Sequence, residues 1–143
     1  MYRSRKSNKR YNPSKTHKKL RSGKQVCPFC DLAGREIVAQ TPYNIVLRNI
    51  HPYQYWEYME VTDHLMIVPK KHVESLHDLT SKEKIDIIDL IATYEKKGYN
   101  VYAREKGNAT KSVPHQHTHL IKTKNKRASF VLYLRKPYFL LRK

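Results

Sequence analysis

The stretch VPHQHTHLIK, residues 113–122, places a histidine at every second position. Alternate residues of a β-strand project to the same face, so a strand over Val113–Ile121 would present all three imidazoles together, with a step of about 7 Å between neighbours. These imidazoles belong to His115, His117 and His119. Because imidazole acts as an acid, a base, a nucleophile or a metal ligand near neutral pH, the stretch predicts a strand with a chemically active face.

Chemistry at phosphorus is the preferred interpretation of this face. A neutral imidazole can attack an α-phosphate and form a covalent nucleotidyl-histidine, which splits one difficult displacement into two easier steps. Flanking histidines could donate protons to phosphate oxygens or to the leaving group. Backbone amides and Ser112, at the mouth of the strand, could hold the developing negative charge. The alternatives are a face that only binds metal, and a half-exposed strand in which the histidines have no chemical role.

Four other segments have the composition of strands. Each is rich in β-branched, aromatic or other apolar residues, and several end at proline or a polar turn. They are Tyr43–Ile50, His64–Pro69, Asn100–Arg104 and Phe130–Leu134.

One long helix is predicted between these strands. Thr80 and Glu83 have the spacing of a capping box, with Thr80 as the N-cap. Apolar residues then follow at helical spacing up to the break at Gly98, and they are Ile85, Ile88, Ile91 and Ala92. Strands that segregate from the helix, with connections short enough for antiparallel pairing, indicate the α+β class.

Charge is concentrated at the two ends of the chain. The formal net charge is +17, and residues 1–25 carry ten Lys and Arg with no acid, while residues 122–143 carry eight with no acid. The middle of the chain, residues 26–121, carries the remaining eleven basic residues and all twelve acids, so its net charge is close to zero. We expect residues 1–25 to be a flexible basic arm and residues 26–143 to be one domain with a basic C-terminal strand or tail. Such ends either keep the protein soluble or attract a polyanion such as nucleic acid.

The hydropathy of the chain predicts a soluble, cytoplasmic protein. Mean hydropathy is −0.78, and no stretch approaches the roughly 20 consecutive apolar residues that a membrane span requires. The basic N-terminal run has no apolar run after it, so we expect no secretory signal.

Both cysteines belong to the motif CPFC, as Cys27 and Cys30. This spacing suits metal binding or a redox pair, and a disulfide between them would close too small a loop to stabilise the fold strongly. No thioredoxin-like βαβ pattern surrounds the motif, which argues against the redox interpretation. A further alternative is two reduced thiols with no metal.

The histidine stretch resembles the signature of the histidine-triad (HIT) nucleotide-binding hydrolases and transferases. Further resemblances are HLMIVPKKH (residues 64–72), similar to the strand and turn before the family's long helix, and VLRNIHPY (residues 46–53), similar to the strand that meets the ribose. KGNATKSVPH (residues 106–115) resembles the phosphate-binding turn. The likeness runs from Cys27 to Lys122 and implies a HIT-like antiparallel sheet with one long and one short helix.

Residue roles follow from the resemblance by position. It implies that His117 is the nucleophile and that His119 lies at the phosphate and assists the leaving group. It further implies a set of nucleotide contacts: Asn49 at the ribose hydroxyls, Leu47 and Ile50 at the base, and Asn108 and Ser112 at the phosphate.

A zinc site is also implied by the resemblance. Members of the family with an early CxxC bind zinc through that pair, the histidine of the Pro-x-x-His turn and the first histidine of the triad. In this chain these ligands are Cys27, Cys30, His72 and His115. Four protein ligands close the site, so the zinc would be structural.

The implied activity is hydrolysis of a nucleoside phosphate derivative, such as a dinucleoside polyphosphate, a nucleotidyl phosphoramidate or an adenylate. Transferase and phosphorylase branches often replace the third histidine with Gln, so His119 favours hydrolysis over nucleotidyl transfer. The resemblance also implies a homodimer with two sheets joined across a two-fold axis. Nucleic-acid binding through the basic ends is the alternative function.

Overall fold

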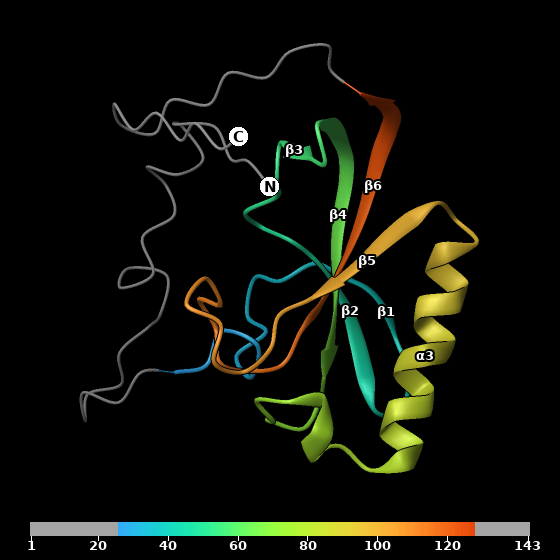
Figure 1. Cartoon of the computed structure of the whole chain (residues 1–143). Coiled ribbons are helices and arrows are strands. Elements are labelled where there is room, and N and C mark those ends of the chain that lie inside the picture. The colour runs from blue at the N-terminus through green and yellow to red at the C-terminus, as the bar shows by residue number, and fades with distance from the viewer. Residues whose placement is uncertain (1–25, 128–143) are drawn as a thin grey trace.

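The computed structural model describes residues 26–127, and Figure 1 traces them from the Cys-containing loop to the last strand. The predicted arm, residues 1–25, and the predicted strand Phe130–Leu134 lie outside the described residues. Predictions about those segments, including nucleic-acid binding by the basic ends, therefore stay predictions.

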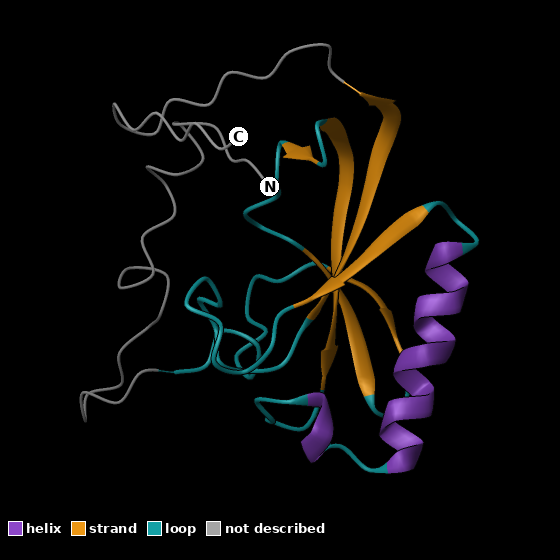
Figure 2. Ribbon diagram, in the orientation of Figure 1, coloured by secondary structure: helices purple, strands orange, loops and turns teal. Residues whose placement is uncertain are grey.

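The described residues form one antiparallel sheet, as predicted for the α+β class (Figure 2). The strand order is β1-β2-β4-β6-β5, and the two-residue strand β3 pairs with β4 beside this path. The strands are β1 (Ile37–Gln40), β2 (Asn44–Arg48), β3 (Tyr55–Trp56), β4 (Met59–Pro69), β5 (Tyr99–Ala103) and β6 (Thr118–Arg127). The predicted strands over residues 43–50, 64–69 and 100–104 are confirmed within a few residues, while β1 had no counterpart in the sequence prediction.

Helix α3 (Ser81–Glu95) covers one face of the sheet, and a short 3₁₀ helix η1 (Leu76–Asp78) precedes it (Figure 2). Thr80 is the N-cap of α3, and its side chain accepts a hydrogen bond from the backbone N–H of Glu83. The Glu83 carboxylate accepts in return from the Thr80 backbone N–H at 2.7 Å. The capping box predicted from the sequence is therefore present in full.

The residues that α3 buries against the sheet are not the apolar residues from whose spacing the helix was predicted. Ile85 and Ile88 are 60% and 61% exposed, whereas Ile87, Leu90 and Tyr94 are buried. The segment is apolar on more than one side, and periodicity cannot tell which stripe meets the sheet. The ring of Tyr94 packs edge-on against Tyr99 of β5, with centroids 5.4 Å apart, and this contact fixes the rotation of the helix.

The prediction of one strand over Val113–Ile121 is wrong at its N-terminal half. Strand β6 begins at Thr118, whose partners are Ile67 of β4 and Ala103 of β5. Pro114 has no N–H for a sheet ladder, and the N–H of Gln116 donates to the carbonyl of Val73 instead. The first two histidines of the triad therefore lie before the strand, in an irregular segment with its own contacts.

Apolar residues pack on both faces of the sheet. Between the sheet and α3 lies the cluster built on Val46, Leu65, Ile67, Val73, Leu79, Ile87, Leu90, Tyr94 and Leu120. On the opposite face Phe29 packs with Ile45, Leu47, Met66 and Val68. The second cluster anchors the Cys-containing loop beneath the triad. Within residues 26–127 no helix is long and apolar enough to cross a membrane.

Thr80→Ala should lower the free energy of unfolding by about 1 kcal/mol, because the substitution leaves a first-turn N–H of α3 without its acceptor. Thr93→Ala, at an exposed position of the same helix whose hydroxyl donates only to the Asp89 carbonyl, is the matched control. It should be neutral or stabilising by up to about 0.5 kcal/mol, because alanine favours helix. Urea unfolding of both variants checks this, and equal losses would contradict the capping role.

Candidate active site

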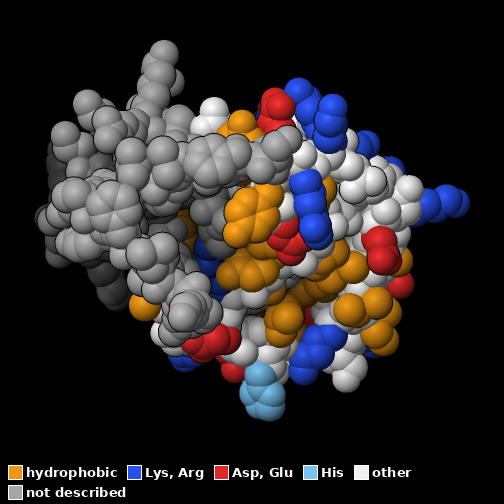
Figure 3. Space-filling view, turned by 45° about the horizontal axis from the view of Figure 1, so that its top comes forward, with side chains coloured by type: hydrophobic (Ala, Val, Ile, Leu, Met, Phe, Trp, Pro, Cys, Tyr) orange, Lys and Arg blue, Asp and Glu red, His pale blue; other side chains and the backbone are white. Residues whose placement is uncertain are grey.

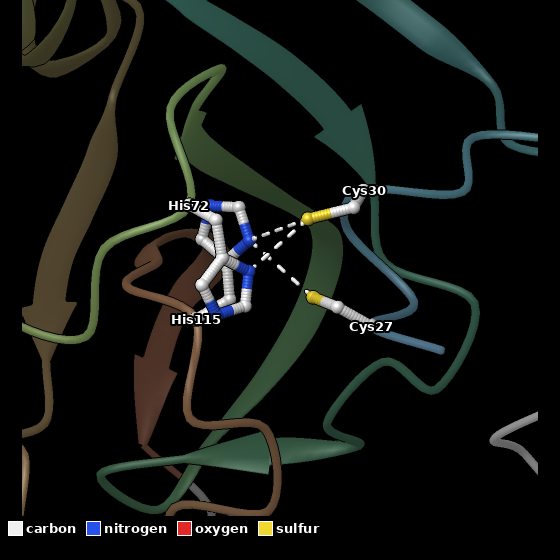
Figure 4. A group of neighbouring side chains, drawn as sticks. All are labelled: Cys27, Cys30, His72 and His115. Carbon is white, nitrogen blue, oxygen red and sulfur yellow. Dashed lines mark hydrogen bonds between the residues drawn. The ribbon is translucent and has the colours of Figure 1, made fainter. Parts of the chain in front are cut away.

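Four side chains from three separate segments meet on the face of the sheet opposite α3. Cys27 and Cys30 come from the N-terminal loop, His72 from the turn after β4, and His115 from the segment before β6. Their ligand atoms all lie within 4.8 Å of one another. Figure 4 shows the two sulfurs and two ring nitrogens pointing toward a common centre. The residues predicted as metal ligands are therefore brought together by the fold.

The spacing of these atoms suits tetrahedral coordination. Sγ of Cys30 is 3.1 Å from Nδ1 of His72 and 3.6 Å from Nδ1 of His115, and Sγ of Cys27 is 3.4 Å from the same nitrogen of His115. With metal bonds typical of zinc, the sulfur–nitrogen edge of a tetrahedron is about 3.6 Å. The donor set and its geometry therefore fit a metal ion, although they do not identify which one.

His115 is held in the tautomer that a metal ligand needs. Its Nε2 lies 2.9 Å from the carbonyl oxygen of Pro69, so Nε2–H donates and the lone pair of Nδ1 faces the sulfurs. The ring is fully buried, and this burial lowers its pKa and keeps it neutral. Burial, followed by the neighbouring Cys27 thiol, raises the pKa of Cys30 to about 11, so a metal ion must displace a proton to bind this sulfur.

A hydrogen bond to the backbone fixes the tautomer of His117. Its Nδ1 lies 2.8 Å from the carbonyl oxygen of His115, so Nδ1–H donates and Nε2 carries the lone pair. Burial, with smaller effects from nearby cationic groups, lowers the pKa of His117 to about 4. Its ring leans on Phe29, with centroids 5.1 Å apart. A neutral, oriented imidazole of this kind can act as a nucleophile.

His119 lies beside His117 and belongs to a second buried cluster. The two ring centroids are 5.0 Å apart. Nδ1 of His119 lies 2.9 Å from Nε2 of His64, and Nδ1 of His64 accepts a hydrogen bond from the backbone N–H of Tyr53 at 3.1 Å. His117 and His119 thus form a pair, while the side chain of His115 joins the cysteines on the same face of the sheet.

The predicted nucleotide contacts lie in three different settings. The carbonyl oxygen of the Asn49 side chain accepts from the N–H of His51, and Leu47 is fully buried in the cluster under Phe29. Ile50 is 49% exposed and lines a pocket of about 190 Å³ together with the loop of residues 26–35. The roles at the ribose and the base stay predictions.

The predicted phosphate turn is ordered by its own hydrogen bonds. Oδ1 of Asn108 accepts from both the N–H and the hydroxyl of Thr110. Lys111 Nζ donates to the side-chain oxygen of Gln116 at 3.0 Å, which ties the turn to the segment between the first two histidines. Ser112, between these positions, is exposed. The turn is thus adjacent to His117 in sequence and linked to it in space.

Two residues of the site were missed by sequence reasoning. Neither His64 nor Arg104 was assigned a role in the site from the sequence. His64 lies two residues before Met66, the direct partner of His119 across the β4–β6 ladder, so the two histidines are diagonal neighbours. Arg104 follows β5 and reaches His119 with Nη1 at 3.4 Å. Neither neighbour relation can be known without the strand register.

Comparison with known proteins identifies the family. The model of the HIT domain matches residues 33–126, which is most of the described chain, and the chain belongs to the HIT domain family. The curated adenosine 5'-monophosphoramidase of Schizosaccharomyces pombe is 26% identical over 107 residues, covering 69% of this chain and 75% of that protein.

Solved structures show the same fold. A histidine triad nucleotide-binding protein from Candida albicans aligns with a TM-score of 0.56 at 22% identity, covering 80% of this chain and 87% of its own. A HIT family hydrolase from Clostridium thermocellum aligns with a TM-score of 0.55 at 20% identity, and the alignment covers 73% of this chain and 96% of that protein. The predicted HIT-like α+β fold is therefore confirmed.

Substitution of a metal ligand should release the ion. We expect about one metal ion per wild-type chain, and loss of that ion in Cys30→Ser and His72→Ala, because a closed site needs all four ligands. A chelator should lower the Tm of the wild type but not of Cys30→Ser. Elemental analysis and thermal unfolding measure both effects.

His77→Ala is the matched control for this experiment, because His77 is exposed in the neighbouring element η1 and lies outside the cluster. It should keep its metal. Full metal content in the two ligand variants would contradict the site.

Proposed function

We propose that this chain is a nucleotide hydrolase that cleaves a nucleoside phosphate derivative through a covalent nucleotidyl-histidine on His117. The observation that carries the proposal is the hydrogen bond from Nδ1–H of His117 to the His115 carbonyl, which leaves Nε2 as an unprotonated nucleophile. Membership of the HIT domain family and the relationship to a monophosphoramidase support hydrolysis of a nucleotide. The chain is accordingly an enzyme of this family.

The first step forms a bond between Nε2 of His117 and the α-phosphorus. The bond from phosphorus to the leaving group breaks, and its electron pair stays with the leaving atom. The imidazole becomes cationic as it loses its lone pair to phosphorus, and the His115 carbonyl, 2.8 Å from Nδ1, stabilises that charge. The protein thus stabilises a charge that develops only as the reaction proceeds.

His119 handles the proton of the leaving group. Where the leaving atom needs a proton, His119 donates one from Nε2 and in the second step takes one back from the attacking water. Where the leaving group departs as an anion, His119 keeps its hydrogen and the proton of the attacking water passes to solvent. The water oxygen bonds to phosphorus, the nitrogen–phosphorus bond breaks, and a nucleoside monophosphate is released. Completion of the second step returns His117 to its neutral form, ready for the next substrate.

Nucleotide contacts are proposed as the sequence predicts them. Ile50 and the loop of residues 26–35 would contact the base, since they line the pocket on this face. Asn49 would meet the ribose, and Asn108 and Ser112 the phosphate. Similarity to an adenosine 5'-monophosphoramidase supports adenosine as the nucleoside and phosphoramidates as candidate substrates.

The metal is proposed to be zinc with a structural role. Two thiolates and two imidazoles at tetrahedral spacing are the ligands that zinc prefers, and four protein ligands leave no open position for substrate. Cys27, Cys30, His72 and His115 would hold it, and its charge would keep both thiols deprotonated. Hydrolysis is favoured over nucleotidyl transfer because His119 is retained as the third histidine of the triad.

A homodimer through the edge of the sheet is also proposed. Strand β5 is the edge strand beside β6, and its Val101 is 40% exposed. The exposed Ile85 and Ile88 of α3 add apolar surface, and Figure 3 shows one face on which apolar side chains gather among charged ones. Joining two β5 strands about a two-fold axis would cover this edge.

His117→Ala should lower kcat with an adenosine phosphoramidate or a diadenosine polyphosphate by at least about 10³-fold, because it removes the nucleophile. Denaturing mass spectrometry of briefly reacted wild type should detect a nucleotidyl adduct on His117. His77→Ala is the control and should retain wild-type turnover. Full activity in His117→Ala, with a normal thermal transition, would refute the proposed mechanism.

Val101→Lys should convert the dimer to a monomer, because it places a charge on the proposed seam. Val38→Lys is a matched control, since Val38 is equally exposed, at 40%, on β1 at the other edge of the sheet. Light scattering coupled to gel filtration measures both masses. A monomeric wild type, or a dimer that persists in Val101→Lys, would count against this interface.

A further inference from the structure

A chain of hydrogen bonds behind His119 decides which of its nitrogens carries the proton. The backbone N–H of Tyr53 donates to Nδ1 of His64, so the neutral His64 ring carries its own proton on Nε2. That Nε2 lies 2.9 Å from Nδ1 of His119 and therefore donates to it. His119 is thus left with its proton on Nε2.

The amide of Asn49 does not alter this assignment. Its nitrogen lies 3.4 Å from Nδ1 and 3.1 Å from Nε2 of His64. The lone-pair directions of the two ring nitrogens diverge, so an atom almost equidistant from both lies over the face of the ring rather than in line with either. The tautomer of His64 is therefore set by Tyr53 and not by the amide.

Arg104 brings a second donor to the same place. Its Nη1 lies 3.4 Å from Nε2 of His119, which is longer than the roughly 2.7–3.2 Å of an ordinary N–H hydrogen bond. A guanidinium has donors only, and Nε2 of His119 also carries a hydrogen. Two N–H groups cannot bond to each other, but both can donate to one oxygen anion placed between them.

The guanidinium is held in this position by two aromatic side chains. Nη2 of Arg104 donates to the hydroxyl of Tyr53 at 3.2 Å, and the guanidinium carbon lies 5.2 Å from the ring centre of Tyr102. Tyr53 thus acts twice, with its backbone on His64 and with its hydroxyl on Arg104. A charged group oriented before substrate arrives loses little entropy on binding.

We propose that Arg104 and Nε2–H of His119 together bind an oxygen of the substrate's leaving group, and that Arg104 makes the site select nucleoside polyphosphates over phosphoramidates. The inference rests on the proposed function, in which His119 lies at the leaving group. When the bond from the α-phosphorus to the bridging oxygen breaks, the electron pair goes to a phosphate oxygen, which leaves as an anion.

The two leaving groups need different help. An arginine stays protonated at any physiological pH, so it stabilises an anion by charge but does not supply a proton. A phosphate or polyphosphate leaves as an anion and gains from that charge. An amine leaving group needs a proton, which His119 supplies and Arg104 does not.

Arg104→Gln tests the proposal through a ratio of two activities. With diadenosine triphosphate, kcat/KM should fall about 10²-fold, the usual effect of removing one donor to a developing anion. With an adenosine phosphoramidate it should fall less than about fivefold, so the selectivity changes at least about twentyfold. Arg104→Lys keeps the positive charge but lacks the two parallel N–H donors of a guanidinium, so its selectivity should lie between those of the wild type and Arg104→Gln.

Two further variants control the experiment. Arg127→Gln removes an exposed arginine at the far end of β6 and should change neither activity more than about twofold. Tyr53→Phe removes only the hydroxyl that orients the guanidinium and should lower the selectivity about three- to tenfold. This second variant keeps the inference testable if Arg104→Gln does not fold, and equal losses on both substrates in either variant would overturn it.

Binding of inorganic pyrophosphate gives a readout that does not depend on turnover. Calorimetry should find that Arg104→Gln weakens this binding about tenfold or more, while His117→Ala retains it. Unchanged pyrophosphate affinity in Arg104→Gln would overturn the inference. A wild type that binds pyrophosphate through Arg104 but hydrolyses neither nucleotide would instead refute the proposed function.

Discussion

One hydrogen bond connects the two halves of the site. The backbone of His115 accepts from Nδ1–H of His117, while the side chain of His115 joins the cysteines. Whatever fixes His115 therefore also fixes the direction in which His117 presents Nε2. The Pro69 carbonyl, Cys27 and Cys30 all contact His115, and a metal ion at the centre of the cysteines would orient His117 through His115 without touching it.

In the second half of the site a backbone group again fixes the tautomer of a histidine. The backbone N–H of Tyr53 sets the tautomer of His64, and His64 in turn sets that of His119. An imidazole nitrogen can be either a donor or an acceptor, whereas a main-chain N–H only donates and a main-chain carbonyl only accepts. In each half of the site such a main-chain group therefore determines which nitrogen of the imidazole carries the hydrogen. The fold thus gives neighbouring histidines opposite tautomers: Nε2 of His117 carries a lone pair, and Nε2 of His119 carries a hydrogen.

Local chemistry made part of this structure predictable from sequence. The capping box of Thr80 and Glu83 needs only four consecutive residues, and CPFC with a Pro-x-x-His turn carries its ligands in short motifs. The rotation of α3 was not predictable, because its apolar residues cover two stripes and Tyr99 selects between them. The pairing of His64 with His119 depends on the register of β4 and β6, which sequence periodicity does not specify.

The cluster of Cys27, Cys30, His72 and His115 also constrains the stage of protein synthesis at which the site can form. Its first and last members are separated by 88 positions along the chain. A ribosome releases residues in order, so the sulfurs emerge long before the last imidazole, and the nascent chain cannot close the centre until β4, α3 and β5 have been made. Ion capture would thus be a late event in biogenesis, and the ring of His117, two residues further on, would be aligned only after nearly all of the sheet has formed.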